Sequence, residues 1–292
     1  MGVRGTTSVG ALQLRFWGVR GSHPVPGKST LRFGGNSSCV AVEADGQVLA
    51  FDAGTGLIGL GRLLLQRPGK SVVHIFLSHL HHDHIEGLRY FEPVYRDDWR
   101  VYLYGPGSSP ATVENTLRRS MDQRLFPVAL AELQARLSIR TLPKREVVRI
   151  PGARNLTVHA QFSRAHPKVG VMLFRIEYRG RSVVYATDVE GPKGGHADVV
   201  AFARNADVLI HDSQYTDHEY FAAQRNKAGW GHSTVRMAAE IAREAKVGRL
   251  LLYHHDPSHD DKEVLHLERL ARSIFTNSQA AFEGLTLKLR AR

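Results

Sequence analysis

A chain of 292 residues that is 42% hydrophobic and 23% charged can bury a large core, and this composition excludes a disordered or low-complexity protein. The single cysteine, Cys39, excludes an internal disulfide and a cysteine-based zinc finger, so any metal ligands must be histidines and carboxylates. The net charge of +11 favours a polyanionic partner or an anionic substrate.

The first residues carry no export or membrane signal. Residues 1–11 have no apolar segment typical of a signal peptide and no regular pattern, so we expect them to be disordered. No later stretch approaches the length of a membrane span. Together with the lone cysteine, these features predict a cytoplasmic protein without a membrane partner.

Apolar alternation in the first half predicts strands that are joined by glycine-bearing turns. The predicted strands are Leu12–Trp17, Cys39–Val42, Val48–Phe51 and Val72–Leu77. Residues 108–136 then carry alanine, leucine, glutamate, arginine and glutamine at helical spacing, broken at Pro127. We therefore expect a helical insertion at about residues 105–150.

The second half repeats the strand pattern. The predicted strands are Leu156–Phe162, Val171–Tyr178, Val183–Ala186, Val208–Ile210 and Leu250–Tyr253, and the predicted helices are Thr234–Ala245 and Glu263–Phe275. Two strand-rich halves, each followed by helices, favour a layered α/β sandwich over a doubly wound parallel sheet. Because no linker interrupts residues 12–292, we expect them to form a single domain.

Four candidate metal ligands crowd into one turn behind the apolar run that ends at Leu77. They are His79, His81, Asp83 and His84. Three imidazoles and a carboxylate this close would repel one another whenever the imidazoles are protonated, and would be costly to desolvate without partners. A divalent ion such as zinc or manganese satisfies all of them, whereas the alternative is a solvated histidine-rich loop.

Further candidate ligands stand where predicted strands of the second half end. His166 follows the strand predicted at Leu156–Phe162, Asp188 follows Val183–Ala186, and His254 follows Leu250–Tyr253. A rigid scaffold holds ligands placed in this way, so residues far apart in sequence can share one site. His255 competes with His254 for the last position.

This pattern resembles the metallo-β-lactamase fold superfamily. The motif that begins at His79, followed by His166, Asp188 and His254, matches the family's ligand positions in order, and Asp52 matches an early aspartate that supports the ligands. The resemblance extends over nearly the whole chain. It implies a four-layer αββα sandwich with a dinuclear metal site along one edge of the paired sheets.

The resemblance also implies how the ligands divide between two divalent ions, with Zn²⁺ expected and Mn²⁺ or Fe²⁺ as alternatives. One ion would be held by His79, His81 and His166, the other by Asp83, His84 and His254, with Asp188 bridging both. His82 occupies a variable position and is not an expected ligand. Because His254 follows the apolar strand directly, we prefer it to His255.

The segment Gly229–Thr234 indicates a branch of the superfamily. It resembles the His-Ser-Thr motif of the tRNase Z and phosphodiesterase branch, in which the histidine donates a proton to the leaving oxygen. In that branch an acid orients the histidine, a role that would fall to Asp212. The expected catalytic residues are therefore His232, Asp212 and Asp83. The structural alternative is that His232 merely precedes a helix cap made by Ser233 or Thr234.

These residues predict a dinuclear metal-dependent phosphodiesterase, with attack by a metal-bridging hydroxide and with His232 as general acid. The insertion lacks the Gly/Pro-rich arm of tRNase Z, so a small or cyclic phosphodiester is the expected substrate. One alternative is a carboxylic ester, lactone or thioester hydrolase of the same fold, and another is a basic nucleic-acid-binding or RNA-processing protein. The branch often forms dimers, which makes a homodimer an option.

Overall fold

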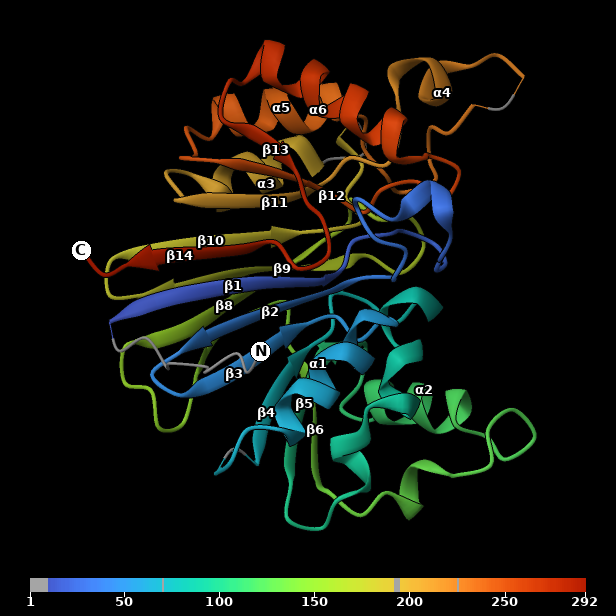
Figure 1. The fold of residues 1–292 in the computed structure, drawn as a ribbon, viewed down its shortest axis with the longest axis vertical. Coiled ribbons are helices and arrows are strands. Elements are labelled where there is room, and N and C mark those ends of the chain that lie inside the picture. Colours follow the sequence, from blue (N-terminus) through green and yellow to red (C-terminus); the bar gives the residue numbers. More distant parts are fainter. Residues whose placement is uncertain (1–9, 70, 192–194, 225) are drawn as a thin grey trace.

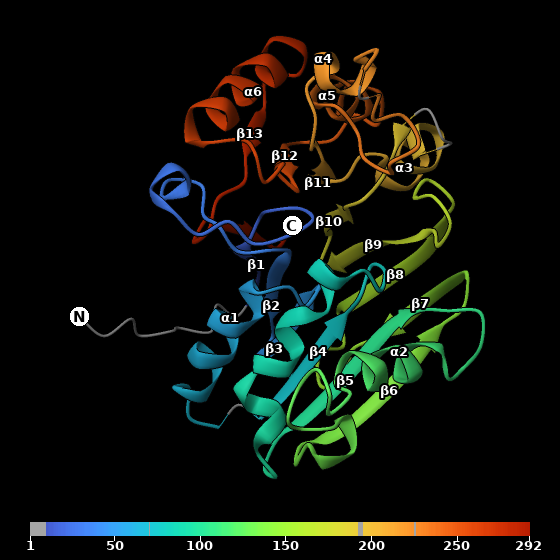
Figure 2. The ribbon, with the colours of Figure 1, turned by 90° about the vertical axis from the view of Figure 1, so that its right-hand side faces the viewer.

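In a computed structural model that describes residues 10–69, 71–191, 195–224 and 226–292, two seven-stranded sheets pack face to face with helices on both outer faces (Figure 1). The expected four-layer αββα sandwich is thus confirmed. In the view turned by 90°, helices α3 (Gly195–Ala203), α5 (Val235–Glu244) and α6 (Asp261–Ile274) lie at the top, and the strands separate them from α1 (Gly56–Leu65) and α2 (Thr112–Ser120) (Figure 2).

The first sheet contains the amino-terminal strands and closes with the last strand of the chain. In order across the sheet, its strands are β14 (Thr286–Arg290), β1 (Ala11–Gly18), β2 (Cys39–Ala44), β3 (Gln47–Phe51), β4 (Val72–Phe76), β5 (Arg100–Pro106) and β6 (Arg136–Leu142). The pairs from β14 to β3 are antiparallel, and those from β3 to β6 are parallel.

The second sheet has a similar arrangement. In order across the sheet, its strands are β13 (Ser278–Ala280), β12 (Leu250–Tyr253), β11 (Val208–Asp212), β10 (Arg181–Ala186), β9 (Val171–Tyr178), β8 (Leu156–Ser163) and β7 (Arg145–Arg149). The strands from β10 to β13 run parallel, so the carboxyl ends of β10, β11 and β12 meet at one edge. Ligands of open α/β sheets bind at such edges.

Short helices complete the described chain. They are the helix α4 (Asp217–Phe221) and the 3₁₀ helices η1 (Lys28–Thr30), η2 (His82–His84), η3 (Glu86–Tyr90), η4 (Glu92–Tyr95) and η5 (Leu130–Glu132). The N-cap of α6 is Asp260, whose side chain accepts hydrogen bonds from the backbone N–H groups of Lys262 and Glu263. The next residue, Asp261, accepts hydrogen bonds from the backbone N–H groups of Arg32 and Phe33.

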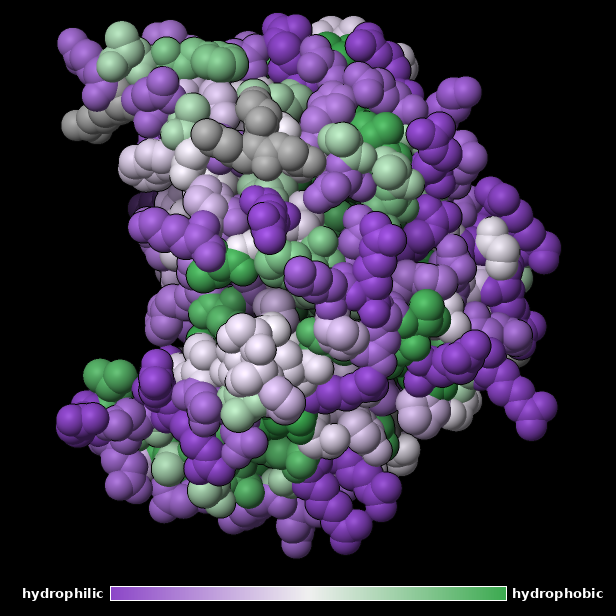
Figure 3. All heavy atoms as spheres, turned by 180° about the vertical axis from the view of Figure 1, so that it is seen from behind, coloured by the Kyte–Doolittle hydropathy of each residue, from purple (hydrophilic) through white to green (hydrophobic). Residues whose placement is uncertain are grey.

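The main core lies between the two sheets. Phe51 and Phe76 stack with their ring centroids 5.3 Å apart, and Phe174 of the opposite sheet meets both rings. Separate apolar clusters fill the spaces between each sheet and its helices. Hydrophobic residues are scattered among hydrophilic ones on the face shown in Figure 3. Among the described residues, no helix has the length and apolar character that a membrane span requires.

The segment 105–150 differs from the helical insertion expected there. It contains one nine-residue α-helix, α2, and then strands β6 and β7. In Arg136–Leu142, polar and apolar residues alternate, and side chains with this period of two suit a half-buried strand. We expected disorder over residues 1–11, of which 1–9 lie outside the described residues, but Ala11 already begins β1.

Candidate metal centre and active site

The candidate site lies at the carboxyl ends of parallel strands in both sheets. In the second sheet, Asp188 follows β10, Asp212 ends β11 and His254 follows β12. In the first sheet, Asp52 follows β3 and His79 lies three residues after β4. The parallel register of these strands explains why residues as far apart in the sequence as Asp52 and His254 converge.

Three of these strand-end residues have a left-handed backbone. The φ angle is 62° at Asp52, 54° at Asp188 and 61° at His254. This conformation costs a non-glycine residue about 1 kcal/mol or more, and strain of this kind clusters at functional sites. The sharp turn lets each side chain point back over the end of its strand.

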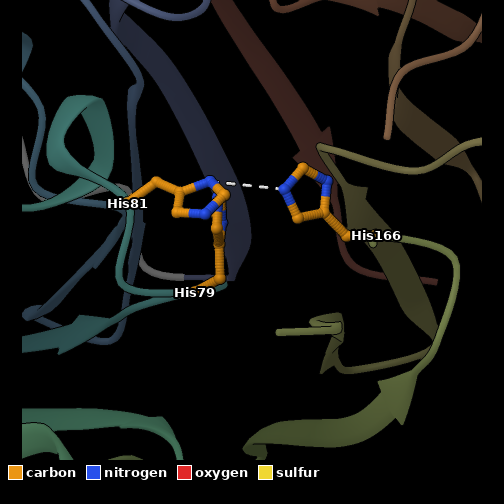
Figure 4. Close-up of side chains that lie close together, drawn as sticks. All are labelled: His79, His81 and His166. Carbon is orange, nitrogen blue, oxygen red and sulfur yellow. Dashed lines mark hydrogen bonds between the residues drawn. The ribbon is translucent and has the colours of Figure 1, made fainter. Parts of the chain in front are cut away.

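His79, His81 and His166 form one group of potential metal ligands. The ring centroids of His79 and His81 lie 4.4 Å apart, and the His166 ring lies 4.8 Å from His79 and 4.9 Å from His81. Figure 4 shows His81 and His166 facing each other, with His81 Nδ1 3.3 Å from His166 Nε2. The chain thus brings together the three histidines assigned to one ion.

Asp83, His84 and His254 form a second group. The Oδ2 atom of Asp83 lies 3.1 Å from His84 Nε2 and 3.3 Å from His254 Nε2. Asp188 lies between the two groups: its Oδ1 faces His79 Nε2 at 3.6 Å, and its Oδ2 faces His84 Nε2 at 3.2 Å. A carboxylate in this position can serve both groups, as expected of a bridging ligand.

The protonation states of His79, His81 and Asp188 suit a divalent cation. Burial, reinforced by neighbouring imidazoles, keeps the pKa values of His79 and His81 below the usual histidine range, so both rings are neutral at pH 7. Burial would raise the pKa of Asp188, but His254, His84 and His79 outweigh it and hold the pKa well below the usual carboxyl range. Metal ligation requires these forms, neutral imidazole and ionised carboxylate. Burial lowers the pKa of His84, but neighbouring carboxylates outweigh burial and raise this pKa well above the usual histidine range, so an ion would have to displace a proton there.

The donor set therefore fits a pair of divalent ions. The buried Nε2 atom of His79 has no hydrogen-bond partner, which is costly unless another group satisfies it. Imidazole and carboxylate ligands suit zinc and related ions. Clustered His and Asp residues of this kind suggest a dinuclear divalent site, while the assignment of each ligand stays a prediction.

The opposite ring nitrogens of the candidate ligands are held by surrounding groups. His84 Nδ1 lies 2.7 Å from Asp52 Oδ2, and His254 Nδ1 lies 2.9 Å from Gln214 Oε1. His166 Nδ1 lies 3.2 Å from the carbonyl oxygen of Gly231. Such contacts fix the orientation and tautomer of metal-binding histidines.

We expect Asp52→Asn to weaken metal binding by about 10-fold to 100-fold, because the amide cannot supply the charge that supports His84. It should also destabilise the protein by about 1–3 kcal/mol. The carboxylate of Asp52 accepts hydrogen bonds from the Ser78 backbone N–H, the Ser78 hydroxyl and the Tyr185 hydroxyl, and an amide nitrogen would leave buried donors unpaired. Zinc titration and urea unfolding measure the two effects.

The matched control is Tyr185→Phe, which removes one hydrogen bond to Asp52 and leaves the contact with His84 intact. Its metal affinity should stay within about threefold of the original, since outer contacts to the ligand are retained. An Asp52→Asn variant that binds zinc as tightly as the unaltered chain would show that Asp52 does not support the ligand.

His232 lies beside the two groups and is paired with Asp212. His232 Nδ1 is 2.8 Å from Asp212 Oδ2, while Asp212 Oδ1 accepts a hydrogen bond from the Ser233 backbone N–H. Burial lowers the pKa of His232, but the Asp212 carboxylate and other nearby carboxylates outweigh burial and raise this pKa to about 9. Its ring also stacks on His254 with a centroid distance of 5.0 Å. His232 can therefore hold a proton next to the candidate metal groups.

Both interpretations of the Gly229–Thr234 segment can apply together. Thr234 caps α5, because its side chain accepts a hydrogen bond from the backbone N–H of Met237. His232 nevertheless points to the site, where His166 and His254 are neighbouring rings. The cap fixes the start of the helix immediately after the histidine.

The structure also shows where His82, His255 and the early glycine turn lie relative to the site. The side chain of His82 is 67% exposed and pairs with Glu86, outside both groups. His255 Nε2 contacts the carbonyl oxygen of Ala281, away from the site, whereas His254 faces Asp83. The early glycine turn reaches the site, because a Cβ on Gly21 would lie 2.4 Å from His254 Nδ1.

Sequence inspection missed two buried groups that shape the site. Gln214 holds His254, and Glu190 accepts hydrogen bonds from the backbone N–H groups of Gly229 and Gly231. Glu190 follows Asp188 by two residues, but a lone glutamate has no distinctive pattern in the sequence. Its partners come from a loop about 40 residues away, which only the folded chain brings near.

Two cavities open beside the histidines. One has a volume of about 600 Å³ and lies between α2 and the loop before β9, with Leu80, Phe162 and Met172 among its lining residues. The other, of about 350 Å³, is lined by His166, Pro167, Gly229 and Trp230. His81 and Lys168 line both cavities, so the two adjoin each other at the candidate metal groups.

Comparisons with known proteins agree with the observed fold. Residues 47–255 match the family model described as the β-lactamase superfamily domain. The chain is 29% identical to a ribonuclease Z of Thermoplasma acidophilum, over 87% of this chain and 89% of that protein. Its fold is similar to the crystal structure of the short form of human tRNase Z, with a TM-score of 0.64, 21% identity and coverage of 94% and 98% of the two chains.

A third similar protein is the metallo-β-lactamase fold protein YhfI of Bacillus subtilis. The TM-score is 0.69 at 18% identity, and the alignment covers 95% of this chain and 99% of that structure. At this level of identity the likeness concerns the fold alone. The arrangement of the two sheets and their outer helices is therefore similar in this chain and in YhfI.

Proposed function

This chain belongs to the family of the β-lactamase superfamily domain. We propose that it hydrolyses phosphodiester bonds of RNA. It is a metal-dependent hydrolase of the phosphodiesterase type. The proposal rests on the position of His232. Its Nδ1 lies 2.8 Å from Asp212 Oδ2, and its ring lies beside two groups of side chains that could bind metal. A phosphodiester has a poor leaving group and needs a proton donor at this place.

One ion would be held by His79, His81 and His166, the other by Asp83, His84 and His254, and Asp188 would serve both. When bound, two such ions supply a water of lowered pKa and offset charge on the phosphoryl oxygens.

The chain's own residues perform the remaining steps. Asp212 holds the His232 imidazole through Nδ1, which leaves Nε2 to give a proton to the leaving oxygen. Lys168 lies where the two cavities meet and can bind a phosphate next to the one being cleaved. The excess positive charge of the chain, +11, favours approach of a polyanion.

The comparisons revise the preference for a small or cyclic diester, because a relative of similar length is named ribonuclease Z. One observation keeps a small diester as the second candidate substrate. The 600 Å³ cavity beside His79 is mostly apolar in its lining and has the size of a pocket for a single nucleotide.

Cleavage of labelled RNA by zinc- and manganese-loaded protein tests the proposal, with a chelated sample as control. We expect chelator-sensitive cleavage of RNA and of bis(p-nitrophenyl) phosphate, and little turnover of p-nitrophenyl acetate. Turnover of the acetate alone would indicate the ester or lactone alternative, and RNA binding without cleavage would indicate a binding module. Cyclic nucleotides hydrolysed in preference to RNA would favour the second candidate.

A further inference from the structure

Trp230 differs from the other two tryptophans of the chain in its exposure. Trp99 is buried and Trp17 is half-buried, whereas 58% of Trp230 is exposed. An exposed indole leaves a large apolar surface in water, and tryptophans in such positions are typical of binding sites. Trp230 lies two residues before His232, the proposed proton donor, and lines a cavity together with His166. The His166 ring in turn lies 5.6 Å from the His232 ring, so a ligand in this cavity would lie one residue away from the proton donor.

The loop that carries Trp230 is fixed on both sides of the indole. The buried carboxylate of Glu190 accepts hydrogen bonds from Gly229 N–H at 2.6 Å and from Gly231 N–H at 2.9 Å. The hydroxyl of Tyr220 donates a third hydrogen bond to it at 2.5 Å. A buried carboxylate is costly to desolvate, and here three hydrogen bonds offset that cost. Two of them fix the backbone on both sides of Trp230.

The backbone on either side of Trp230 requires glycine. Gly229 and Gly231 have φ angles of 89° and 96°, and a Cβ on Gly231 would lie 2.3 Å from His166 Nδ1. The carbonyl oxygen of Gly231 lies 3.2 Å from the same nitrogen. The loop therefore packs against a candidate metal ligand with no room for a side chain at Gly231, and it brings the intervening indole to the cavity that His166 lines.

Positive charge accompanies the indole. The ammonium group of Lys227 lies 4.0 Å from the centre of the Trp230 ring, which orders both side chains through a cation–π contact. Lys168, His81 and His166 line the same 350 Å³ cavity as Trp230. An indole with one lysine over its ring and a second lysine in the same cavity suits a ligand that is both aromatic and anionic, which describes a nucleotide.

We propose that Trp230 is a stacking platform for the nucleobase of the nucleotide that carries the leaving oxygen. This inference rests on the proposed function and specifies its substrate, because it requires a base on the side of the scissile bond nearest His232. Stacking of a base on an aromatic side chain stabilises binding whichever of the four bases is present. The platform therefore predicts recognition of RNA that is tolerant of sequence at this nucleotide.

The test uses metal-loaded protein and an RNA oligonucleotide whose cleavage position has been mapped. Three versions are compared: the normal RNA, one with an abasic ribose at the leaving-side nucleotide, and one with an abasic ribose across the scissile bond. For the unaltered protein we expect the leaving-side abasic RNA to raise KM by about 5-fold to 100-fold with little change in kcat. In Trp230→Ala that penalty should fall to about twofold or less, and Trp230→Phe should restore most of it.

Tyr90→Ala is the matched control, because Tyr90 is an aromatic residue with 52% exposure that lines neither cavity. It should keep the full penalty for the abasic RNA. A penalty that is unchanged in Trp230→Ala, or that occurs at the nucleotide across the scissile bond, would overturn the platform. Absence of RNA cleavage by the unaltered protein would instead refute the proposed function, so the two failures are distinguishable.

Discussion

Replacing Asp188 with asparagine should reduce the bound metal from two ions to one or none and lower turnover of RNA by about 1000-fold or more. Asp188 is the carboxylate whose two oxygens face different groups, His79 on one side and both His84 and His254 on the other. An amide has one acceptor oxygen and no charge, so it cannot replace a carboxylate between two cations. Metal analysis of the purified variant measures the effect independently of activity.

Asparagine is preferred to alanine here because of the backbone. Asp188 has a φ of 54°, a conformation that asparagine tolerates and alanine does not. The variant should therefore fold, and its backbone N–H can still donate a hydrogen bond to Asp212 Oδ2. A loss of metal in this variant then reflects the missing charge rather than a distorted strand end.

Thermal unfolding gives a second measurement of the same effect. An ion that binds only the folded chain stabilises it by about 2.7 kcal/mol at a concentration 100 times its Kd. Zinc should thus raise the unfolding temperature of the unaltered protein by several degrees and that of Asp188→Asn much less. Asp217→Asn is the matched control, since this carboxylate is partly exposed and pairs with Arg236 at 2.6 Å. If Asp188→Asn retains two ions and the full zinc response, the bridging assignment is wrong.

The fold could be predicted where hydrophobic periodicity was unambiguous. The strands expected at Val171–Tyr178 and Leu250–Tyr253 have those bounds in the structure, and α5 differs from its prediction by one residue at each end. Helix α1 was missed because Gly59 and Gly61 weaken the local helical signal. Tertiary packing requires those glycines, since a Cβ would meet Trp17 at Gly59 and Phe91 at Gly61.

The positions of the candidate ligands were predictable for a related reason. Polar residues at the ends of apolar strands are visible in the sequence, and parallel neighbours bring such ends together, as they do for Asp188 and His254. The groups that support the ligands were not predictable. Gln214 and Glu190 act through partners about 40 residues away, and no local pattern marks a residue whose role depends on such a contact.

Replacing His232 with alanine should lower kcat for RNA by about 100-fold to 10,000-fold while both ions stay bound. His232 is also close enough to Asp188, Asp212 and His254 to share a metal group with them, so metal content decides between a proton donor and a ligand. The contact of its Nδ1 with Asp212 at 2.8 Å favours the donor, because that carboxylate holds a proton on the ring. A variant that loses an ion along with its activity would identify His232 as a ligand.

The dependence on the leaving group separates a proton donor from a residue that only precedes the cap of α5. A p-nitrophenolate leaves without protonation, whereas a ribose oxygen needs a proton. His232→Ala should therefore lose about tenfold or less with bis(p-nitrophenyl) phosphate, against at least 100-fold with RNA. Thr234→Ala is the control for the helix start, because the Thr234 side chain caps α5 by accepting a hydrogen bond from the Met237 backbone N–H. Equal losses with both substrates in His232→Ala would place the histidine in a structural role, since misplacement of the helix affects every substrate alike.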